Sequence, residues 1–527
     1  MPARRVSRRA PTSLRPFRHR GFSLLWAGGF VSIVGSWMQT VAVGALITAR
    51  TGRASWAVLV AAGAFLPIGV LSPVGGALAD RIARRPALVA SNLVQALLAA
   101  LLAVLVAHSR SSPALLIAVV TLQGCVSALS GPFQQAILPD LVGREELLAA
   151  ASLGSAQFNL GRVLGPALAG ATIAAFGYPV AFVANAISFL AVVAALAFVP
   201  LPPPPGRALG GGLWRAMSSG AAAAWGEPSC RAAITTIALV ALLASPFIAL
   251  VPVVALHLSH GAAGAVASAT GLLTTAQGLG AVVGALGLPA LAARHGRGRV
   301  LIASIALLPP ALVGYSAAGS LAIALVALAA VGVVYIGVLS GLSTVVQLRA
   351  PSGARGRVLS FYLVALGVAY PFGSLLEGPL ADRLGVAWTT GGSAVLLAAA
   401  LAGLAIAHPG ALRALLRSAP GSEDSTRPDS RRAGPRANGR HTGSGSGPME
   451  RRLAMHERPA QDEIPVIEAG EPLAPVDAAD IAGRDSEVDF DDETEEDQLP
   501  LDELEARELG VLLDDPEVVA AREDRED

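Results

Sequence analysis

The stretch Gly76-Ala77-Leu78-Ala79-Asp80-Arg81-Ile82-Ala83-Arg84-Arg85 lies between two long apolar runs, residues 55–78 and 86–107. Each run is long enough to cross a bilayer, because about 20 apolar residues suffice. A short segment with three arginines and one aspartate therefore forms a loop at one membrane face. This stretch predicts an integral membrane protein, and its charges help to decide which face the loop occupies.

Charge is unevenly distributed along the 527-residue chain. Of its 38 acidic residues, seven precede residue 409 and the other 31 lie in the last 119 residues. All 39 basic residues are arginines, and 25 of them precede residue 409. The chain thus consists of a basic, apolar part and an acidic tail. Abundant Ala, Gly and Arg without Lys indicate a GC-rich bacterial genome.

Twelve apolar runs follow a basic N-terminal arm. They are residues 22–48, 55–78, 86–107, 113–138, 148–176, 179–199, 232–256, 265–291, 299–317, 321–347, 357–382 and 387–408. Their length favours helices over strands, and membrane helices tolerate the Gly and Pro that they contain. The longest connection, residues 200–231, divides the runs six and six. We therefore expect an all-α polytopic membrane protein with 12 transmembrane helices in two pseudo-symmetric six-helix bundles.

These runs define five segments. They are a basic cytoplasmic arm (1–21), an N-terminal six-helix bundle (22–199), a cytoplasmic central loop (200–231), a C-terminal six-helix bundle (232–408) and a disordered, acidic cytoplasmic tail (409–527). With the N-terminus inside, the inside segments hold 20 arginines and the outside connections hold four. The excess of arginine favours a multi-pass protein of the plasma membrane with both termini in the cytoplasm.

The two halves repeat one another. Two sets of glycines share spacings of five and seven residues: Gly165, Gly170 and Gly177, and Gly373, Gly378 and Gly385. Each set follows a loop that contains proline and arginine. Repeated six-helix halves imply a transporter whose substrate site lies between the halves, near the middle of the bilayer.

Two motifs resemble those of the major facilitator superfamily. Residues 76–85 resemble its motif A, G-x-L-A-D-R-x-G-R-R, with Ala83 in place of the second glycine. Residues 161–170 resemble the antiporter motif C, G-x-x-x-G-P-x-x-G-G, with Ala169 in place of a glycine. Residues 35–42 and 134–142 are similar to the branch of enterobactin exporters and macrolide efflux proteins, called transmembrane secretion effectors. The resemblance covers residues 15–408 and implies a secondary transporter of the exporting kind.

Motif A is expected to form a gate at the inside face. Its residues here are Gly76, Asp80, Arg81, Arg84 and Arg85. The resemblance implies that Asp80 faces the positively polarised start of span eleven, where Arg355 lies, and closes the inside gate in the outward-facing state. Gly76 is expected to permit a close approach of helices. The alternative is that the arginines only set the topology.

Motif C is expected to be a packing surface. Its residues here are Gly161, Gly165, Pro166 and Gly170. Small residues let helices approach closely, and a proline removes one backbone hydrogen bond from the helix. The resemblance implies that this surface packs span five against span eight, where Gly280 and Gly284 offer a matching small face.

Two ionisable residues, Arg162 and Glu377, fall deep within predicted spans, and we assign them to intramembrane charge and proton coupling. Such residues usually line a cavity or a proton path. Arg162 could contact an anionic substrate or act as a structural hub, with Asn159 helping to solvate it. Glu377 could carry a proton or be a polar residue near the outer mouth. Asp140 is expected to cap its loop together with Arg144.

Polar residues within the inner helices predict the lining of a substrate cavity. They are Gln39, Gln123, Asn159, Asn185, Gln277 and Tyr335. Sparse polarity among aliphatic residues favours a hydrophobic or amphipathic substrate over a sugar.

No enzyme, cofactor or metal site is indicated, because the chain has no Walker A loop, metal-ligand cluster or triad spacing. We expect a monomer that binds a small molecule, protons and membrane lipids but no nucleic acid. The leading hypothesis is proton-coupled export of a drug, antibiotic or siderophore by alternating access. The alternatives are a lipid or peptide exporter without proton coupling and a membrane scaffold or sensor whose acidic tail recruits a protein partner. That tail could also serve only as a solvating segment.

Overall fold

The computed structural model describes residues 12–79, 81–108, 111–199, 221–259, 263–351 and 354–416. All the named elements in this part of the chain are helices. The first half comprises η1 (Thr12–Arg18), α1 (Arg20–Thr51), α2 (Ala54–Ala79), α3 (Arg84–Ala107), α4 (Pro113–Ala136), α5 (Leu138–Phe176) and α6 (Tyr178–Phe198). The second half comprises α8 (Pro228–Leu243), α9 (Phe247–Leu258), α10 (Ala263–His295), α11 (Arg297–Ser316), α12 (Leu321–Arg349), α13 (Arg355–Leu384), α14 (Val386–Ala407) and α15 (Pro409–Leu416).

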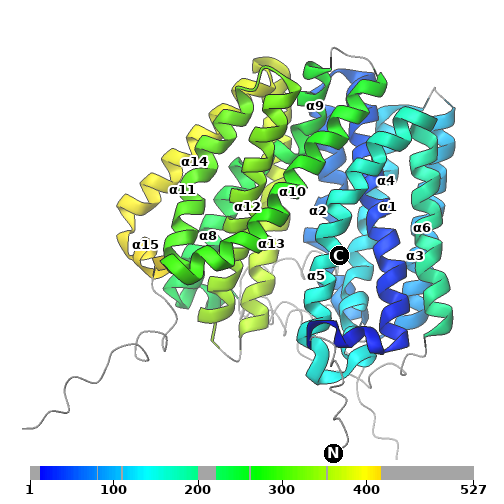
Figure 1. The fold of residues 1–527 in the computed structure, drawn as a ribbon, viewed down its shortest axis with the longest axis horizontal. Coiled ribbons are helices and arrows are strands. Elements are labelled where there is room, and N and C mark those ends of the chain that lie inside the picture. Colours follow the sequence, from blue (N-terminus) through cyan, green and yellow to red (C-terminus); the bar gives the residue numbers. More distant parts are fainter. Residues whose placement is uncertain are drawn as a thin grey trace, which may run out of the picture. The chain divides into compact units, whose positions relative to one another are not determined.

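The helices are long and apolar enough to cross a membrane. Eleven candidate spans are found in the described part, with α8 and α9 joined as one span over Pro228–Leu258. Helix α5 is not among the eleven, because Asn159 and Arg162 interrupt its apolar sequence. It nevertheless runs beside α1 and α10 (Figure 1). The described part is therefore all-helical, and the chain is a multi-pass membrane protein, as the sequence predicts.

The two halves pack their helices in the same way. In the first half α2 packs on α4, α3 on α6 and α1 on α5. The corresponding pairs of the second half are α10 with α12, α11 with α14 and α8 with α13. Between the halves α5 contacts α10, and its counterpart α13 contacts α2. This correspondence agrees with the repeat of glycine spacings in the sequence.

Near the end of α2, a glycine permits a close approach to α4, but it is not the glycine that was predicted. A Cβ atom on Gly75 would lie 2.7 Å from the carbonyl oxygen of Ala128, whereas one on Gly76 would meet nothing within 4 Å. The prediction that Gly76 permits a close helix approach is therefore wrong. Gly75 has this role because it faces α4.

Two boundaries differ from the sequence prediction. Helix α8 begins at Pro228, inside the predicted central loop, because Glu227 caps it by accepting a hydrogen bond of 2.7 Å from the backbone N–H of Cys230. Residues 409–416 form α15 instead of belonging to a disordered tail. This helix packs on α8 and α11, where the backbone of Leu416 meets Gly298. The acidic residues of the tail lie outside the described part.

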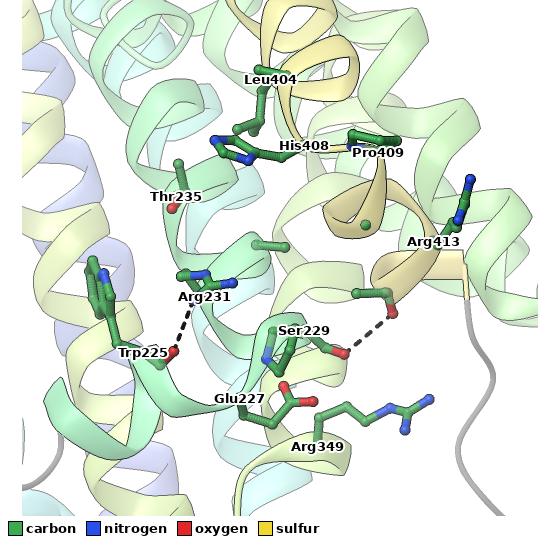
Figure 2. Close-up of a pocket in the computed structure, with 15 residues that line it drawn as sticks. Trp225, Glu227, Ser229, Arg231, Thr235, Arg349, Leu404, His408, Pro409 and Arg413 are labelled. Carbon is green, nitrogen blue, oxygen red and sulfur yellow. Dashed lines mark hydrogen bonds between the residues drawn. The ribbon is translucent and has the colours of Figure 1, made fainter.

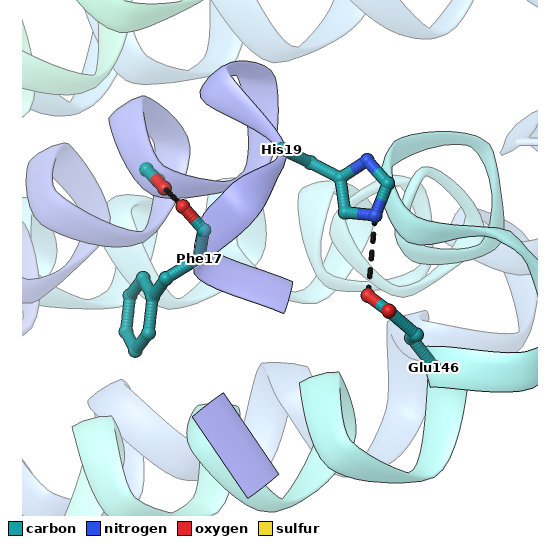
Figure 3. A network of polar contacts seen from close by, with 4 residues as sticks. Phe17, His19 and Glu146 are labelled. Atoms are coloured by element: carbon teal, nitrogen blue, oxygen red, sulfur yellow. Dashed lines mark hydrogen bonds and ion pairs between the residues drawn. The ribbon is translucent and has the colours of Figure 1, made fainter. Parts of the chain in front are cut away.

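The alternation of the helices gives the bundle two ends. We call the end at which α1, α3, α11 and α13 begin the basic end, since Arg84, Arg297 and Arg355 lie there. We call the opposite end, where α2 begins and α13 finishes, the Asp382 end. At the basic end, His19 ahead of α1 and Glu146 of α5 form a hydrogen bond of 3.1 Å (Figure 3). This contact joins the N-terminal arm to the first half.

Candidate functional site

A cavity of about 1270 Å³ lies between the two halves. Helices α1, α4 and α5 of the first half and α10, α12 and α13 of the second contribute to its lining. The lining reaches the basic end, where it includes Phe22, Gln135 and Leu141. Neither Ala54 nor Asp382 belongs to it. The cavity therefore extends toward the basic end and stops short of the Asp382 end.

All six residues predicted for the substrate cavity lie in this lining. They are Gln39, Gln123, Asn159, Asn185, Gln277 and Tyr335. Gln39 donates to Gln123 at 2.6 Å and accepts from Asn185 at 2.8 Å. These amides thus form a network within the first half, which links α1, α4 and α6. Their contact with a substrate remains a prediction.

The second half presents tyrosines to the same cavity. The hydroxyl of Tyr335 hydrogen-bonds that of Ser245 at 2.8 Å, which connects α12 to the junction of α8 and α9. The ring of Tyr370 packs edge-on against Phe65 of α2, with 5.6 Å between the ring centroids. Tyr370 thus contacts the opposite half.

Arg162 lies in the lining at the middle of α5 and is only 9% exposed. It makes no hydrogen bond or ion pair with any residue that the structure describes. Tyr335 and Tyr370 of the second half line the same cavity. The prediction that Asn159 helps to solvate it is not met, since the Asn159 amide donates to the Ser155 carbonyl at 2.9 Å. Arg162 is a buried cation that faces a cavity.

Glu377 lies in the part of α13 toward the Asp382 end and is 5% exposed. It does not belong to the lining of the central cavity. One carboxylate oxygen is buried without a hydrogen-bond partner, and Ser393 of α14 is near enough to interact with the group. The structure does not bring Glu377 together with Arg162. Within the described residues, these two are the buried charged side chains.

Motif C forms two packing faces of α5. Gly161 and Gly165 face α1, where added Cβ atoms would meet Ile33 and the Val34 carbonyl. Gly170 faces α10, in contact with the backbone of Ser268. Pro166 also faces α10, since a Cβ on Gly271 would lie 2.6 Å from its carbonyl oxygen.

The partner surface on α10 differs from the one predicted. Gly271 and Gly278 face α5, whereas Gly280 and Gly284 face α12, where their Cβ atoms would meet the backbones of Ala329 and Val333. The prediction that Gly280 and Gly284 form the matching face is wrong. The reason is the helical period, because residues 271 and 278 are two turns apart on one face and residues 280 and 284 lie on another.

Two arginines of motif A have partners within the first half. Arg84 forms an ion pair with Asp140 at the start of α5. Arg85 donates to the Ala197 carbonyl at 2.8 Å, and Arg81 is exposed. Asp140 thus binds Arg84 at the start of α3, and its predicted contact with Arg144 stays a prediction, because the side chain of Arg144 lies outside the described part. Asp80, the predicted gate residue, lies outside the described residues.

A contact that the sequence prediction missed closes the Asp382 end. The Asp382 carboxylate, at the end of α13, accepts hydrogen bonds from the backbone N–H groups of Ala54 at 2.5 Å and Ser55 at 3.2 Å. These are the first residues of α2, whose N–H groups have no partner within the helix. A carboxylate is favoured there by the helix dipole.

An apolar cluster lies beneath this contact. Ala54 and Val58 of α2 pack there with Leu250 of α9, and Ala381 and Tyr370 of α13 belong to the same cluster. Gly378 lets the helices meet, since its Cβ would lie 3.1 Å from the Ser55 Cα atom. Carboxylate and cluster together join the two halves at the Asp382 end.

A signal in the sequence could have identified Asp382. The sequence G-x-L-A-D-R occurs at residues 76–81, where motif A lies, and again at residues 378–383. The first copy ends α2 at the basic end, and the second ends α13 at the opposite end. Two spans that contact one another therefore finish in the same acidic sequence at opposite ends.

A second cavity, of about 1110 Å³, lies at the basic end of the second half. Arg231, Arg349, His408 and Arg413 surround it together with Glu227 (Figure 2). The hydroxyl of Ser229 donates to the Ala414 carbonyl at 3.4 Å, which attaches α15 to α8. This cavity belongs to one half alone, so a compound that crosses between the halves does not pass through it.

A family model matches most of the chain. The model described as transmembrane secretion effector matches residues 11–421, which include all the long helices. Among solved structures, a bacterial homologue of the lysosomal transporter Spinster, in an inward-facing and occupied conformation, has a TM-score of 0.60 at 14% identity. That likeness covers 77% of this chain and 99% of the other. A bacterial homologue of the iron transporter ferroportin has a TM-score of 0.54 at 18% identity, over 73% and 98% of the two chains.

Several curated relatives are transporters. The chain is 28% identical to the multidrug efflux pump Tap of Mycolicibacterium fortuitum, over 69% of this chain and 89% of that protein. It is 30% identical to the staphyloferrin A transporter of Staphylococcus aureus, but over only 33% of this chain and 44% of that protein. Macrolide efflux protein A of Streptococcus pyogenes is 26% identical over 28% of this chain and 36% of that protein. These matches agree with one another on transport and differ in the compound.

Proposed function

The chain belongs to the transmembrane secretion effector family of the major facilitator superfamily, and on this premise we propose that it exports a hydrophobic or amphipathic compound through the central cavity. The central cavity supports this function, because it lies between the two halves and ends below the Asp382 contact. A substrate site at the interface of two repeats is the arrangement that alternating access requires. The named efflux relatives favour export over uptake.

The proposed orientation places the basic end in the cytoplasm. Arginine is concentrated at this end, where Arg231, Arg297 and Arg355 are exposed. An excess of arginine on the cytoplasmic side is the strongest determinant of membrane topology. In this orientation the cavity faces the cytoplasm, from which an exporter takes its substrate, and both termini are cytoplasmic in the plasma membrane.

In the proposed transport cycle, one end of the cavity opens as the other end closes. The Asp382 contact holds the outer end shut while the cavity faces inward. Asp80 at the end of α2 would then hold the start of α13 once the inner end closes. Each acid would neutralise the helix N-terminus of the opposite half, and the two contacts would not form together.

Glu377 is the proposed proton carrier. Its carboxyl group is buried and one oxygen lacks a hydrogen-bond partner, so a bound proton would relieve the cost of an unpaired charge. It lies in α13, the helix that also carries Asp382. A change of its protonation state would therefore act on the helix that closes the outer end.

Efflux from cells tests the proposal. Cells that produce the protein should accumulate less of at least one amphipathic compound from a panel of drugs, antibiotics and siderophores than cells without it. Cells that produce equal amounts of a Gly378→Trp variant provide the control, because a large side chain there would separate α2 from α13. If every compound accumulates equally in cells with the native protein, with the variant and without the protein, export is not the function. That result would favour the scaffold hypothesis.

A further inference from the structure

The charge of Arg162 has no counter-ion in the part of the chain that the structure describes. Most described acids are engaged elsewhere: Asp140 with Arg84, Glu146 with His19, Glu227 with the start of α8, and Asp382 with the start of α2. Arginine stays protonated in proteins, so the group keeps its charge when buried. An uncompensated buried charge costs several kcal/mol. This cost favours an anion beside Arg162, and no acid of the described residues supplies one.

The surroundings of Arg162 provide further hydrogen-bond donors. Helix α10 packs on α5 at this level, where Gly278 meets the Arg162 carbonyl and the Thr275 hydroxyl donates to the Val163 carbonyl at 3.3 Å. Gln277 lies between them in sequence, is 2% exposed and lines the cavity. Its side-chain nitrogen has no hydrogen-bond partner. A cation and an unpartnered amide donor therefore occur on neighbouring helices from the two halves.

From this arrangement we infer that the cavity binds an amphipathic organic anion whose carboxylate is held by Arg162. A guanidinium offers two parallel N–H donors that match the two oxygens of a carboxylate. The apolar body of the ligand would lie along the aliphatic and aromatic lining, to which Trp37, Phe65 and Phe158 belong. This inference rests on the proposed function and adds the chemical class of its substrate.

The position of Arg162 explains how substrate binding would couple to closure of the two halves around the cavity. Arg162 belongs to the first half, whereas Gln277, Tyr335 and Tyr370, which line the same cavity, belong to the second. A carboxylate on Arg162 would accept hydrogen bonds from donors on both sides of the interface. It would therefore hold the halves together at the middle of the cavity.

Binding to the full-length protein in nanodiscs tests the inference without transport. The probes are pyrenebutyrate, its methyl ester and pyrenebutanol, which share one apolar body. We expect the native protein to bind the carboxylate about tenfold more tightly than either neutral probe, as a charge-assisted hydrogen bond allows. Arg162→Met should remove this preference and leave the affinity for pyrenebutanol unchanged. Arg162→Lys should keep part of it, and Arg297→Gln, at an exposed arginine, should keep all of it.

Two results would overturn the inference. One is equal affinity of the native protein for all three probes. The other is an equal loss of affinity for all three probes in the Arg162→Met variant, which would make Arg162 a structural residue. If the preference is absent while cells still export neutral or cationic compounds, the inference fails and the proposed function stands. If the preference is present and no compound is exported, the inference stands and the export function fails.

Discussion

The carboxylate of Asp382 accepts a hydrogen bond of 2.5 Å from the backbone N–H of Ala54, 328 residues earlier in the chain. This contact joins the end of α13 to the start of α2 and thereby the two halves. It lies opposite the end to which the cavity extends. Loss of this contact is therefore expected to open the Asp382 end.

Neutralising Asp382 should loosen this end. Asp382→Asn keeps one oxygen but loses the interaction with the helix dipole, and because the residue is exposed we expect a loss of about 1 kcal/mol. The reporter is a Val58→Cys side chain, which is buried beneath the contact. A membrane-impermeant maleimide should label it roughly fivefold faster in the variant. The native cysteines, Cys125 and Cys230, are first replaced by alanine.

The matched control for this experiment is Arg383→Gln, which changes the neighbouring charge and leaves the carboxylate in place. Labelling at the native rate is expected in this control. Equal labelling rates in Asp382→Asn and the native background would show that the carboxylate does not hold the end shut.

The packing of α5 on α10 should depend on Gly271. A methyl group there would lie 2.6 Å from the Pro166 carbonyl, so Gly271→Ala should destabilise the protein by about 1–3 kcal/mol. Gly287→Ala is the control on the same helix, because nothing lies within 4 Å of its added Cβ. Thermal unfolding in detergent should show a lower midpoint for the first variant alone. Identical midpoints would contradict the assigned interface.

Glu377 should be required for coupling to the proton gradient. In proteoliposomes, Glu377→Gln should abolish export driven by a pH gradient while exchange of the compound down its own gradient continues. The amide removes the titratable group and keeps the shape of the side chain. Glu145→Gln, at an exposed acid of the basic end, should behave like the native protein. Export by Glu377→Gln at the native rate under a pH gradient would assign the proton to another residue.

Arg84 and Asp140 should be energetically coupled. Their side chains are 15% and 23% exposed, so the ion pair is partly shielded from solvent. A double-mutant cycle with Arg84→Gln and Asp140→Asn should give a coupling of about 0.5–1 kcal/mol in thermal stability, the upper range for pairs near a surface. Strictly additive effects of the two changes would mean that the pair contributes nothing.

The sequence predicts the fold well because its decisive signals are local. Long apolar runs determine the helices, and all six polar residues predicted for the cavity lie in its lining. Partners across the structure are harder to predict. The wrong choice of Gly76 over Gly75 and of Gly280 over Gly271 arose because glycine spacing alone does not show which face of a helix meets a neighbour. A shift of one position along a helix changes the face on which the glycine lies, and therefore the helix that it contacts.

Asp382 was missed for a related reason. The comparison of the two halves relates α2 to α10, and in that comparison Ala293 replaces Asp80. An inverted repeat within each half instead relates α10 to α13. In that comparison Asp382 of α13 corresponds to Asp80, which follows α2. Helices α2 and α13 contact one another and finish at opposite ends of the bundle.

Distances between pairs of spin labels at the two ends test whether the protein works by alternating access. One pair, at Arg53 and Arg383, spans the Asp382 end, and the other, at Ile82 and Ser360, spans the basic end. All four positions are exposed. In lipid nanodiscs, Asp382→Asn should shift the first pair to longer distances and the second pair to shorter ones. If each pair shows a single distance that is the same in the native protein and in the variant, the two ends do not open in alternation.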